Sequence, residues 1–324
     1  MTFAPLGFCM ALIAYGASML AGTLLAVPFL RAATRVSDPV DRARAIVAVR
    51  FAPTVVASLV VGFAFLPAFL GYEPRDTTES ITGAMAALAG ATGLIFLAGL
   101  LRGLLSLGTT RKLVRRWSRN AQPIEIPGIA LPSFLVEERF PLVSLAGVLC
   151  PRLYVARSVL EHCDRDELAA VVAHEAGHLR RRDPWMRLLV RSCPDLLSMT
   201  PLGDRLERAW AEAAEQLADD HASRTRPRAA MDLASALIKV ARLAPGTKPL
   251  EVPIPALYRG EGVAGRVARL LDRDGTPCER GRMGGMAFLM ASLFAIPLFL
   301  SAAEELRFFQ RAHTVIETVV TFLQ

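Results

Sequence analysis

Four long stretches of this sequence lack charged side chains. They cover residues 1–30, 51–72, 81–101 and 283–303. Charged residues make up only 21% of the chain and hydrophobic residues make up 53%, which is more than soluble domains usually contain. Each stretch is long enough to cross a hydrocarbon core, which takes about 20 helical residues. The missing charge therefore favours a polytopic membrane protein with four transmembrane helices over a soluble protein with buried helices.

Two further absences narrow the class of protein. The first apolar stretch lacks the basic residues that open a secretory signal peptide, so we expect it to be a retained anchor. The five cysteines are odd in number and scattered, and no CxxC pair occurs. This pattern argues against a disulfide framework and against a thiolate zinc site. We expect free thiols in a reducing compartment.

The net charge of +7 is concentrated beside the apolar stretches. Lys and Arg in short flanking segments are retained on the cytoplasmic side of a membrane. We therefore expect both termini outside, residues 103–282 in the cytoplasm, and basic flanks that attract anionic lipid headgroups. Nucleic-acid binding is a weak alternative, because no aromatic or Gly-rich recognition pattern interleaves the arginines.

The chain is expected to be mostly α-helical, with an α+β domain between the third and fourth spans. The predicted divisions are a three-helix membrane region (1–119), a cytoplasmic domain (120–282), a fourth span (283–303) and a short outer tail (304–324). In the cytoplasmic domain, short strands are predicted near 124–126, 141–144 and 153–156. Helices are predicted from 158 and over 167–179, 186–198, 203–223, 228–243 and 261–273, with a Pro-rich loop at 245–256.

The helix predicted over 167–179 carries the strongest chemical signal. Asp164 or Asp166 is its expected cap, and it should stop near Asp183-Pro184, because the residue before a proline disfavours helical geometry. It contains the motif HExxH, formed by His174, Glu175 and His178.

Two histidines four residues apart project from one helix face and can bind one Zn²⁺ ion. Glu175, between them, cannot easily bind the same ion, but it can take a proton from a zinc-bound water. A pair of surface histidines is the simpler alternative reading.

A catalytic zinc site needs a third protein ligand, and Glu215 is the best candidate. Glu212 is its rival on the same predicted helix. Asp219, one turn after Glu215, could accept the other ring N–H of a ligating histidine and fix its tautomer. On their own, these carboxylates would be read as a solvated acidic helix face. The HExxH motif upstream makes the ligand role the preferred interpretation.

Two neighbouring residues have alternative roles. His221 could donate a hydrogen bond to a developing oxyanion, although a plain surface histidine is the simpler reading. Asp183 is expected to end the helix or to pair with a nearby arginine rather than to bind metal.

The sequences HEAGHLRRRD at 174–183 and EQLADD at 215–220 resemble the bacterial β-lactam-sensor (BlaR/MecR-type) family of integral-membrane zinc peptidases. The resemblance covers roughly residues 120–225. It implies a gluzincin-like domain with His174, His178 and Glu215 as ligands and Glu175 as catalytic base. Three spans before this segment and one after it also match the family's membrane plan.

The chain departs from that family after the last span. Sensors of β-lactams carry a large extracellular penicillin-binding domain there, whereas only residues 304–324 follow the fourth stretch, without an SxxK sequence. Antibiotic sensing by that route is therefore not implied. The tail has an amphipathic helix pattern that would suit the outer membrane surface or a membrane partner. Heat-shock membrane peptidases and prenyl-protein endopeptidases share the motifs, but their span arrangement fits less well.

The sequence thus predicts a membrane zinc metalloendopeptidase that cleaves a cytoplasmic or membrane-proximal protein in signalling or regulation. The expected location is the bacterial inner membrane. One alternative is a non-catalytic transducer with a structural zinc site. A transporter is a third reading, but the apolar stretches contain no charged residues to form an ion pathway.

Overall fold

The computed structural model describes most of the membrane region and the domain that follows it. The described residues are 3–75, 80–126, 131–138, 143–148, 150–243, 262–272, 314, 315 and 318. The fourth apolar stretch, the loop expected at 245–256 and nearly all of the tail lie outside these residues.

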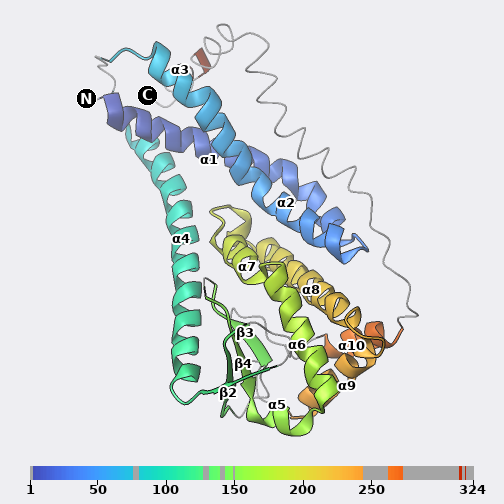
Figure 1. The fold of residues 1–324 in the computed structure, drawn as a ribbon. Coiled ribbons are helices and arrows are strands. Elements are labelled where there is room, and N and C mark those ends of the chain that lie inside the picture. Colours follow the sequence, from blue (N-terminus) through green and yellow to red (C-terminus); the bar gives the residue numbers. More distant parts are fainter. Residues whose placement is uncertain are drawn as a thin grey trace.

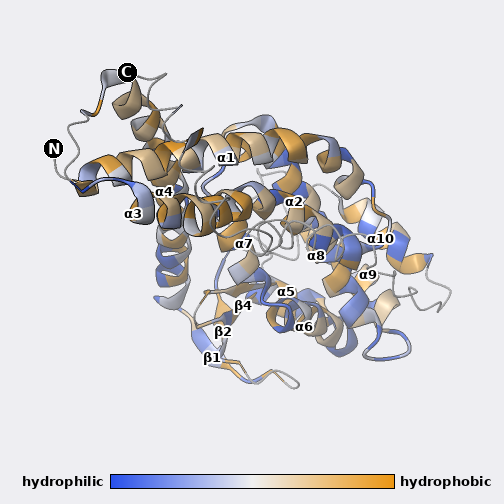
Figure 2. Cartoon of the chain, turned by 90° about the horizontal axis from the view of Figure 1, so that it is seen from above, coloured by the Kyte–Doolittle hydropathy of each residue, from blue (hydrophilic) through white to orange (hydrophobic). Residues whose placement is uncertain are grey.

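Three helices among the described residues are long and apolar enough to span a membrane. They are α1 (Phe3–Thr34), the continuous helix Pro39–Tyr72 and α4 (Gly83–Ser118). The second comprises α2 (Pro39–Leu59), a π-helical turn (Val60–Phe65) and α3 (Leu66–Tyr72). They contain residues 3–30, 51–72 and 83–101 of the first three charge-free stretches, and Figure 2 shows hydrophobic residues along much of α1 and α2. The helical nature of these stretches follows the prediction.

A four-stranded sheet begins shortly after α4. Its strands are β1 (Gln122–Ile124), β2 (Ser133–Val136), β3 (Val143–Ala146) and β4 (Arg152–Ala156), in the order β1-β2-β4-β3. The central pair β2 and β4 is parallel, and the two outer pairs are antiparallel. The sequence predicted three of these strands, with β1 and β3 displaced by about two residues. It missed β2.

Helices cover the sheet and carry the candidate site. They are α5 (Arg157–His162), α6 (Arg165–Arg180), α7 (Asp183–Ser192), α8 (Pro201–Ser223), α9 (Ala229–Leu243) and α10 (Val263–Leu271), with a 3-10 turn at Leu197–Met199. Asp164 caps α6, and Glu167 reaches back to the Asp164 backbone to complete a capping box. Residues Tyr154 of β4, Val171 of α6 and Leu237 of α9 lie fully buried in one shared core.

The prediction for residues 183–198 was wrong in its boundaries. α6 ends at Arg180, and Asp183-Pro184 opens α7 instead of closing α6. A proline is well suited to the first turn of a helix, because its missing N–H would have no intrahelical partner there. α7 then ends at Ser192, earlier than expected.

The helical domain lies between α4 and the α1–α2 pair (Figure 1). The first half of α2 packs along α8, where Ile46 and Trp210 share a buried cluster. Arg42 also donates a hydrogen bond to Gln216 at 2.6 Å. The segment Pro39–Leu59 therefore has two roles, since its start binds the domain and its end continues into the second apolar stretch.

Residues 193–200, which join α7 to α8 and are called the junction loop here, contact two of the long helices. Arg50 of α2 forms a buried ion pair with Asp195 at 3.2 Å. Arg102 of α4 donates to the carbonyl oxygens of Cys193 at 3.1 Å and Ser198 at 2.9 Å. A Cβ atom at Gly99 of α4 would lie 2.8 Å from the Ser192 carbonyl oxygen, so only glycine permits this approach. The junction loop thus fixes the domain to the membrane helices.

Candidate metal centre

Helix α6 presents His174 and His178 one turn apart on its buried face. Both side chains are about 1% exposed or less, and their ring centroids lie 4.8 Å apart. The helix can approach α8 closely because residue 177 is a glycine. A Cβ atom there would lie 3.1 Å from Cα of Ala218. The close approach brings the two imidazoles to the surface of α8.

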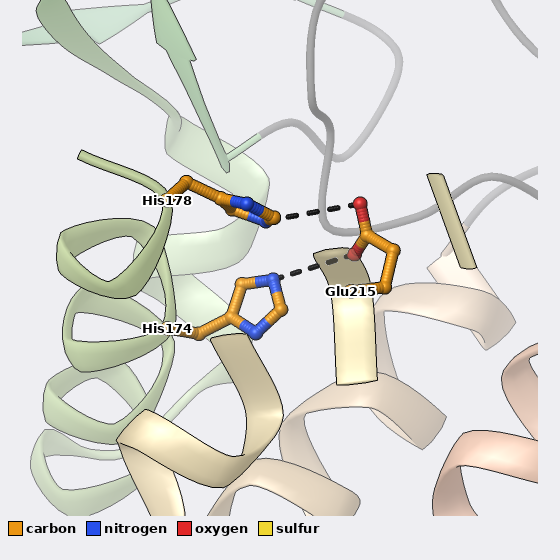
Figure 3. A group of neighbouring side chains, drawn as sticks. All are labelled: His174, His178 and Glu215. Carbon is orange, nitrogen blue, oxygen red and sulfur yellow. Dashed lines mark ion pairs between the residues drawn. The ribbon is translucent and has the colours of Figure 1, made fainter. Parts of the chain in front are cut away.

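Helix α8 presents Glu215 to both imidazoles. Its carboxylate oxygens lie 3.5 Å from Nε2 of His174 and 3.7 Å from Nε2 of His178, as Figure 3 shows. One ligand atom from each of the three residues falls within 4.8 Å of the others. A tetrahedral ion with bonds of about 2.1 Å holds neighbouring ligand atoms about 3.4 Å apart. The observed spacing fits this arrangement.

The atoms that face one another here are mainly hydrogen-bond acceptors. Among the described residues, Nε2 of both histidines and Oε1 of Glu215 are buried without a hydrogen-bond partner, while Oε2 of Glu215 lies 3.2 Å from the Arg266 guanidinium. Buried polar atoms are nearly always paired, so three unpaired atoms that converge on one point need an explanation. A bound cation would satisfy all three at once. Two imidazoles and a carboxylate form a donor set that zinc prefers.

Each histidine has a carboxylate behind it. Nδ1 of His174 lies 3.0 Å from Asp219, and Nδ1 of His178 lies 2.8 Å from Asp183. Such partners hold the proton on Nδ1, orient the ring and leave the Nε2 lone pair free for a metal. Asp219 thus lies beside the His174 ring, and its role in fixing the tautomer stays a prediction. The role of Asp183 was missed, although its pairing with an arginine occurs, since Arg181 lies 3.5 Å away.

Arg266 of α10 is a further residue that the sequence did not single out. Its guanidinium contacts Asp219 at 2.6 and 2.9 Å and Glu215 at 3.2 Å. Burial raises the pKa of the Asp219 carboxyl, but Arg266 and His174 outweigh that effect and hold it below its usual range. Arg266 therefore keeps the carboxylate behind His174 ionised.

The carboxylates of the site favour a positive charge between them. Burial lowers the pKa of His174, but contacts with Asp219 and Glu215 outweigh burial and raise the pKa to about 9. Burial raises the pKa of Glu215, but the neighbouring His178, His174 and Arg266 bring it down to about 2. The same field that stabilises an imidazolium would stabilise a metal cation bound by neutral imidazoles.

Glu175 lies in the same buried region, on α6. Its Oε2 accepts a hydrogen bond of 3.0 Å from the backbone N–H of Leu145 in β3, whereas its Oε1 has no partner within the described parts of the chain. Burial raises the pKa of this carboxyl. Leu145 thus fixes the side chain through one oxygen and leaves the other free for a proton.

Two candidates from the sequence lie outside the three-residue group. Glu212, the rival to Glu215, is exposed. His221 is half-buried beside Gly177, and burial together with Arg180 and Arg224 lowers its pKa. Its oxyanion role stays a prediction.

The segment that carries this geometry also matches a known family. Residues 145–216 match the sequence model of peptidase family M48. The match begins in β3 and ends just after Glu215, so it covers His174, His178 and Glu215. No curated protein matches the chain. Peptidases of family M48 are metal-dependent. The match and the three long apolar helices together support a membrane-associated metallopeptidase.

Proposed function

We propose that this chain is a zinc-dependent endopeptidase of the membrane, with His174, His178 and Glu215 as metal ligands and Glu175 as catalytic base. The convergence of buried ligand atoms from His174, His178 and Glu215 carries the proposal. The M48 match supports the reaction class independently, because it rests on sequence rather than geometry.

The number of ligands favours catalysis over a purely structural zinc site. Structural sites are closed by four protein ligands, whereas catalytic sites use three and keep one position open. Three candidate ligands are grouped here within the described residues. When bound, zinc would polarise the scissile carbonyl and make a water molecule acidic enough to lose a proton near neutral pH.

The remaining steps are assigned to the chain's own side chains. Glu175 would take the proton of the attacking water on Oε1 and pass it to the leaving amine nitrogen. The N–H of Leu145 holds Oε2 and thereby fixes the direction from which Oε1 acts. Asp219 and Asp183 keep the protons of both imidazoles on Nδ1 throughout.

The finer parts of the proposal rest on charge placement and on the resemblance to the β-lactam-sensor family. We place the domain on the cytoplasmic side of a bacterial inner membrane. Basic residues lie at both ends of the segment that contains the domain, and Lys and Arg beside a span are retained in the cytoplasm. The substrate is then a cytoplasmic or membrane-proximal protein, and cleavage would serve regulation.

The test compares purified wild-type chain with Glu175→Gln in detergent micelles. Each protein is loaded with zinc and mixed with a peptide library, and new N-termini are identified by mass spectrometry. Removal of the base should lower the cleavage rate by about 100-fold or more, while zinc content stays at the wild-type level. Glu212→Gln is the matched control, because the same substitution on an exposed position of α8 should leave both quantities unchanged.

Two results would count against the proposal. Unchanged cleavage by Glu175→Gln would exclude this residue as the base. Stoichiometric zinc without cleavage by the wild-type chain, in the library and in membranes, would favour a non-catalytic zinc-stabilised transducer.

A further inference from the structure

Helix α7 buries two charged side chains and exposes two large apolar ones. Its buried residues are Asp183, Arg187 and Val190. Its exposed large side chains are Trp185 and Leu189, which lie four residues apart on one face and are 40% and 47% exposed. A helix on an aqueous surface shows the opposite distribution. The outward face of α7 therefore suits an apolar neighbour.

The position of α7 beside α4 indicates what that neighbour is. Ser192, at the end of α7, lies against Gly99 and Gly103 of α4. These glycines bracket residue 101, where the third charge-free stretch ends. The C-terminal end of α7 is thereby fixed at the level where α4 leaves the apolar zone, and Figure 1 shows α7 between α4 and α2.

Helix α4 carries its own exposed apolar side chains at that level. They are Leu100, Leu101, Leu104 and Leu105, all of them about half exposed or more. Leu104 and Leu105 lie past Arg102, so the apolar surface of α4 extends beyond the charge-free stretch. Leu189 is one helical turn before Ser192, which contacts Gly99 and Gly103 of α4.

A second pair of exposed apolar side chains follows the junction loop. Met199 is 55% exposed and Leu202 is 38% exposed. Met199 directly follows Ser198, whose carbonyl oxygen accepts from Arg102 of α4. This pair is therefore also held beside the membrane-proximal part of α4.

We propose that Trp185, Leu189, Met199 and Leu202 form a lipid-binding surface that seats the peptidase domain in the headgroup region of the bilayer. Tryptophan prefers this zone, because its ring is apolar and its N–H can bond to polar groups there. The surface continues the lipid-facing side of α4 and depends on neither metal binding nor catalysis.

Tryptophan fluorescence tests the proposal directly, because the chain has only three tryptophans and two of them are buried. Trp117 is 4% exposed and Trp210 is 2% exposed, so the difference between wild type and Trp185→Phe isolates the Trp185 emission. The full chain is reconstituted in phosphatidylcholine vesicles with a minority of phosphatidylglycerol. Nitroxide-labelled phosphatidylcholine is then added with the label at the headgroup, in the upper acyl chain or near the bilayer centre.

We expect the Trp185 emission to be blue-shifted, poorly quenched by aqueous iodide, and mostly lost with the headgroup or upper-chain label. A label at the bilayer centre should quench it least. Two single substitutions to tryptophan in the Trp185→Phe background provide reference values for a lipid-facing and a water-facing position. Leu104→Trp marks the lipid-facing side of α4. Glu161→Trp marks an exposed position on α5, which should respond to iodide and not to labelled lipid.

Two results would overturn the inference. Iodide quenching equal to that of the Glu161→Trp probe would place Trp185 in water. Protection from both iodide and all labelled lipids would mean that protein covers this surface. Repeating the experiment with Glu175→Gln separates this inference from the proposed function, because the loss of cleavage should leave the quenching unchanged.

Discussion

The two ends of α7 adjoin two buried clusters of charged and polar side chains, and the two clusters differ in the residues that face one another. At its start, Asp183 lies behind His178 in the candidate metal centre. At its end, the junction loop brings Asp195 to Arg50. In the junction a guanidinium faces a carboxylate, so the cluster contains its own cation. In the candidate metal centre the inward-facing atoms are two imidazole nitrogens and the Glu215 carboxylate, and Arg266 pairs with Asp219 and with one oxygen of Glu215. Both clusters contain a buried ion pair, but among the described residues only the candidate metal centre also groups three ligand atoms that could share one metal ion.

The largest expected effect lies at the metal centre. Glu215→Gln removes the only carboxylate among the three grouped ligand candidates, so zinc affinity should fall by more than about 1,000-fold, beyond the ~10–100-fold range for outer partners. Competition with a chelator of known affinity measures the change. Glu212→Gln should bind zinc like wild type, and wild-type affinity in Glu215→Gln would remove this residue from the ligand set.

Substitutions in the junction loop should lower the free energy of unfolding rather than the affinity for zinc. Asp195→Ala leaves Arg50 buried without its ion pair, which should cost about 3–5 kcal/mol of unfolding free energy. Thermal unfolding in micelles gives the shift. The double variant Arg50→Met with Asp195→Leu should recover most of the loss, because no uncompensated charge remains. A double variant as unstable as the single one would show that the pair itself stabilises the junction.

The carboxylates behind the imidazoles should have an intermediate effect. Asp219→Asn and Asp183→Asn keep shape but remove the charge that orients each ring, so zinc affinity should fall by about 10–100-fold. Isothermal titration with zinc measures it, and Asp204→Asn on an exposed position of α8 is the control. Unchanged affinity in both variants would show that ring orientation comes from packing alone.

An exposed ion pair should show the smallest effect. Arg157 contacts Glu137, and both side chains are largely open to solvent. Arg157→Ala should change the unfolding free energy by less than about 1 kcal/mol, because solvent screens such pairs. A loss as large as that of Asp195→Ala would show that burial does not distinguish the two pairs.

The parts of the site that the sequence predicted depend on local spacing. Two histidines four residues apart must share a helix face, and Asp164 with Glu167 marks the start of that helix. Glu215 was predicted because a catalytic zinc site needs a third ligand and this carboxylate lies on a later predicted helix. The structure places it beside both imidazoles.

The missed parts depend on contacts between distant segments or on unusual backbone. Arg266 lies 47 residues beyond Asp219, and nothing in its own neighbourhood marks it. Asp183 reaches His178 because Arg182 adopts a left-handed conformation with φ of 56°, which is uncommon for a residue with a side chain. Strand β2 has only four residues, and its exposure does not alternate, so it lacks the periodic pattern that marks a half-exposed strand.

The length of α4 has a consequence for substrate choice. Its 36 residues extend about 54 Å, some 24 Å more than a hydrocarbon core is thick. The excess forms a stiff arm that carries β1 only three residues past its end. The arm and the contacts of the junction loop together set one height for Glu175, the proposed catalytic base, above the lipid. A membrane-anchored substrate would therefore be cut at a set number of residues from its own anchor, whatever side chains flank the bond.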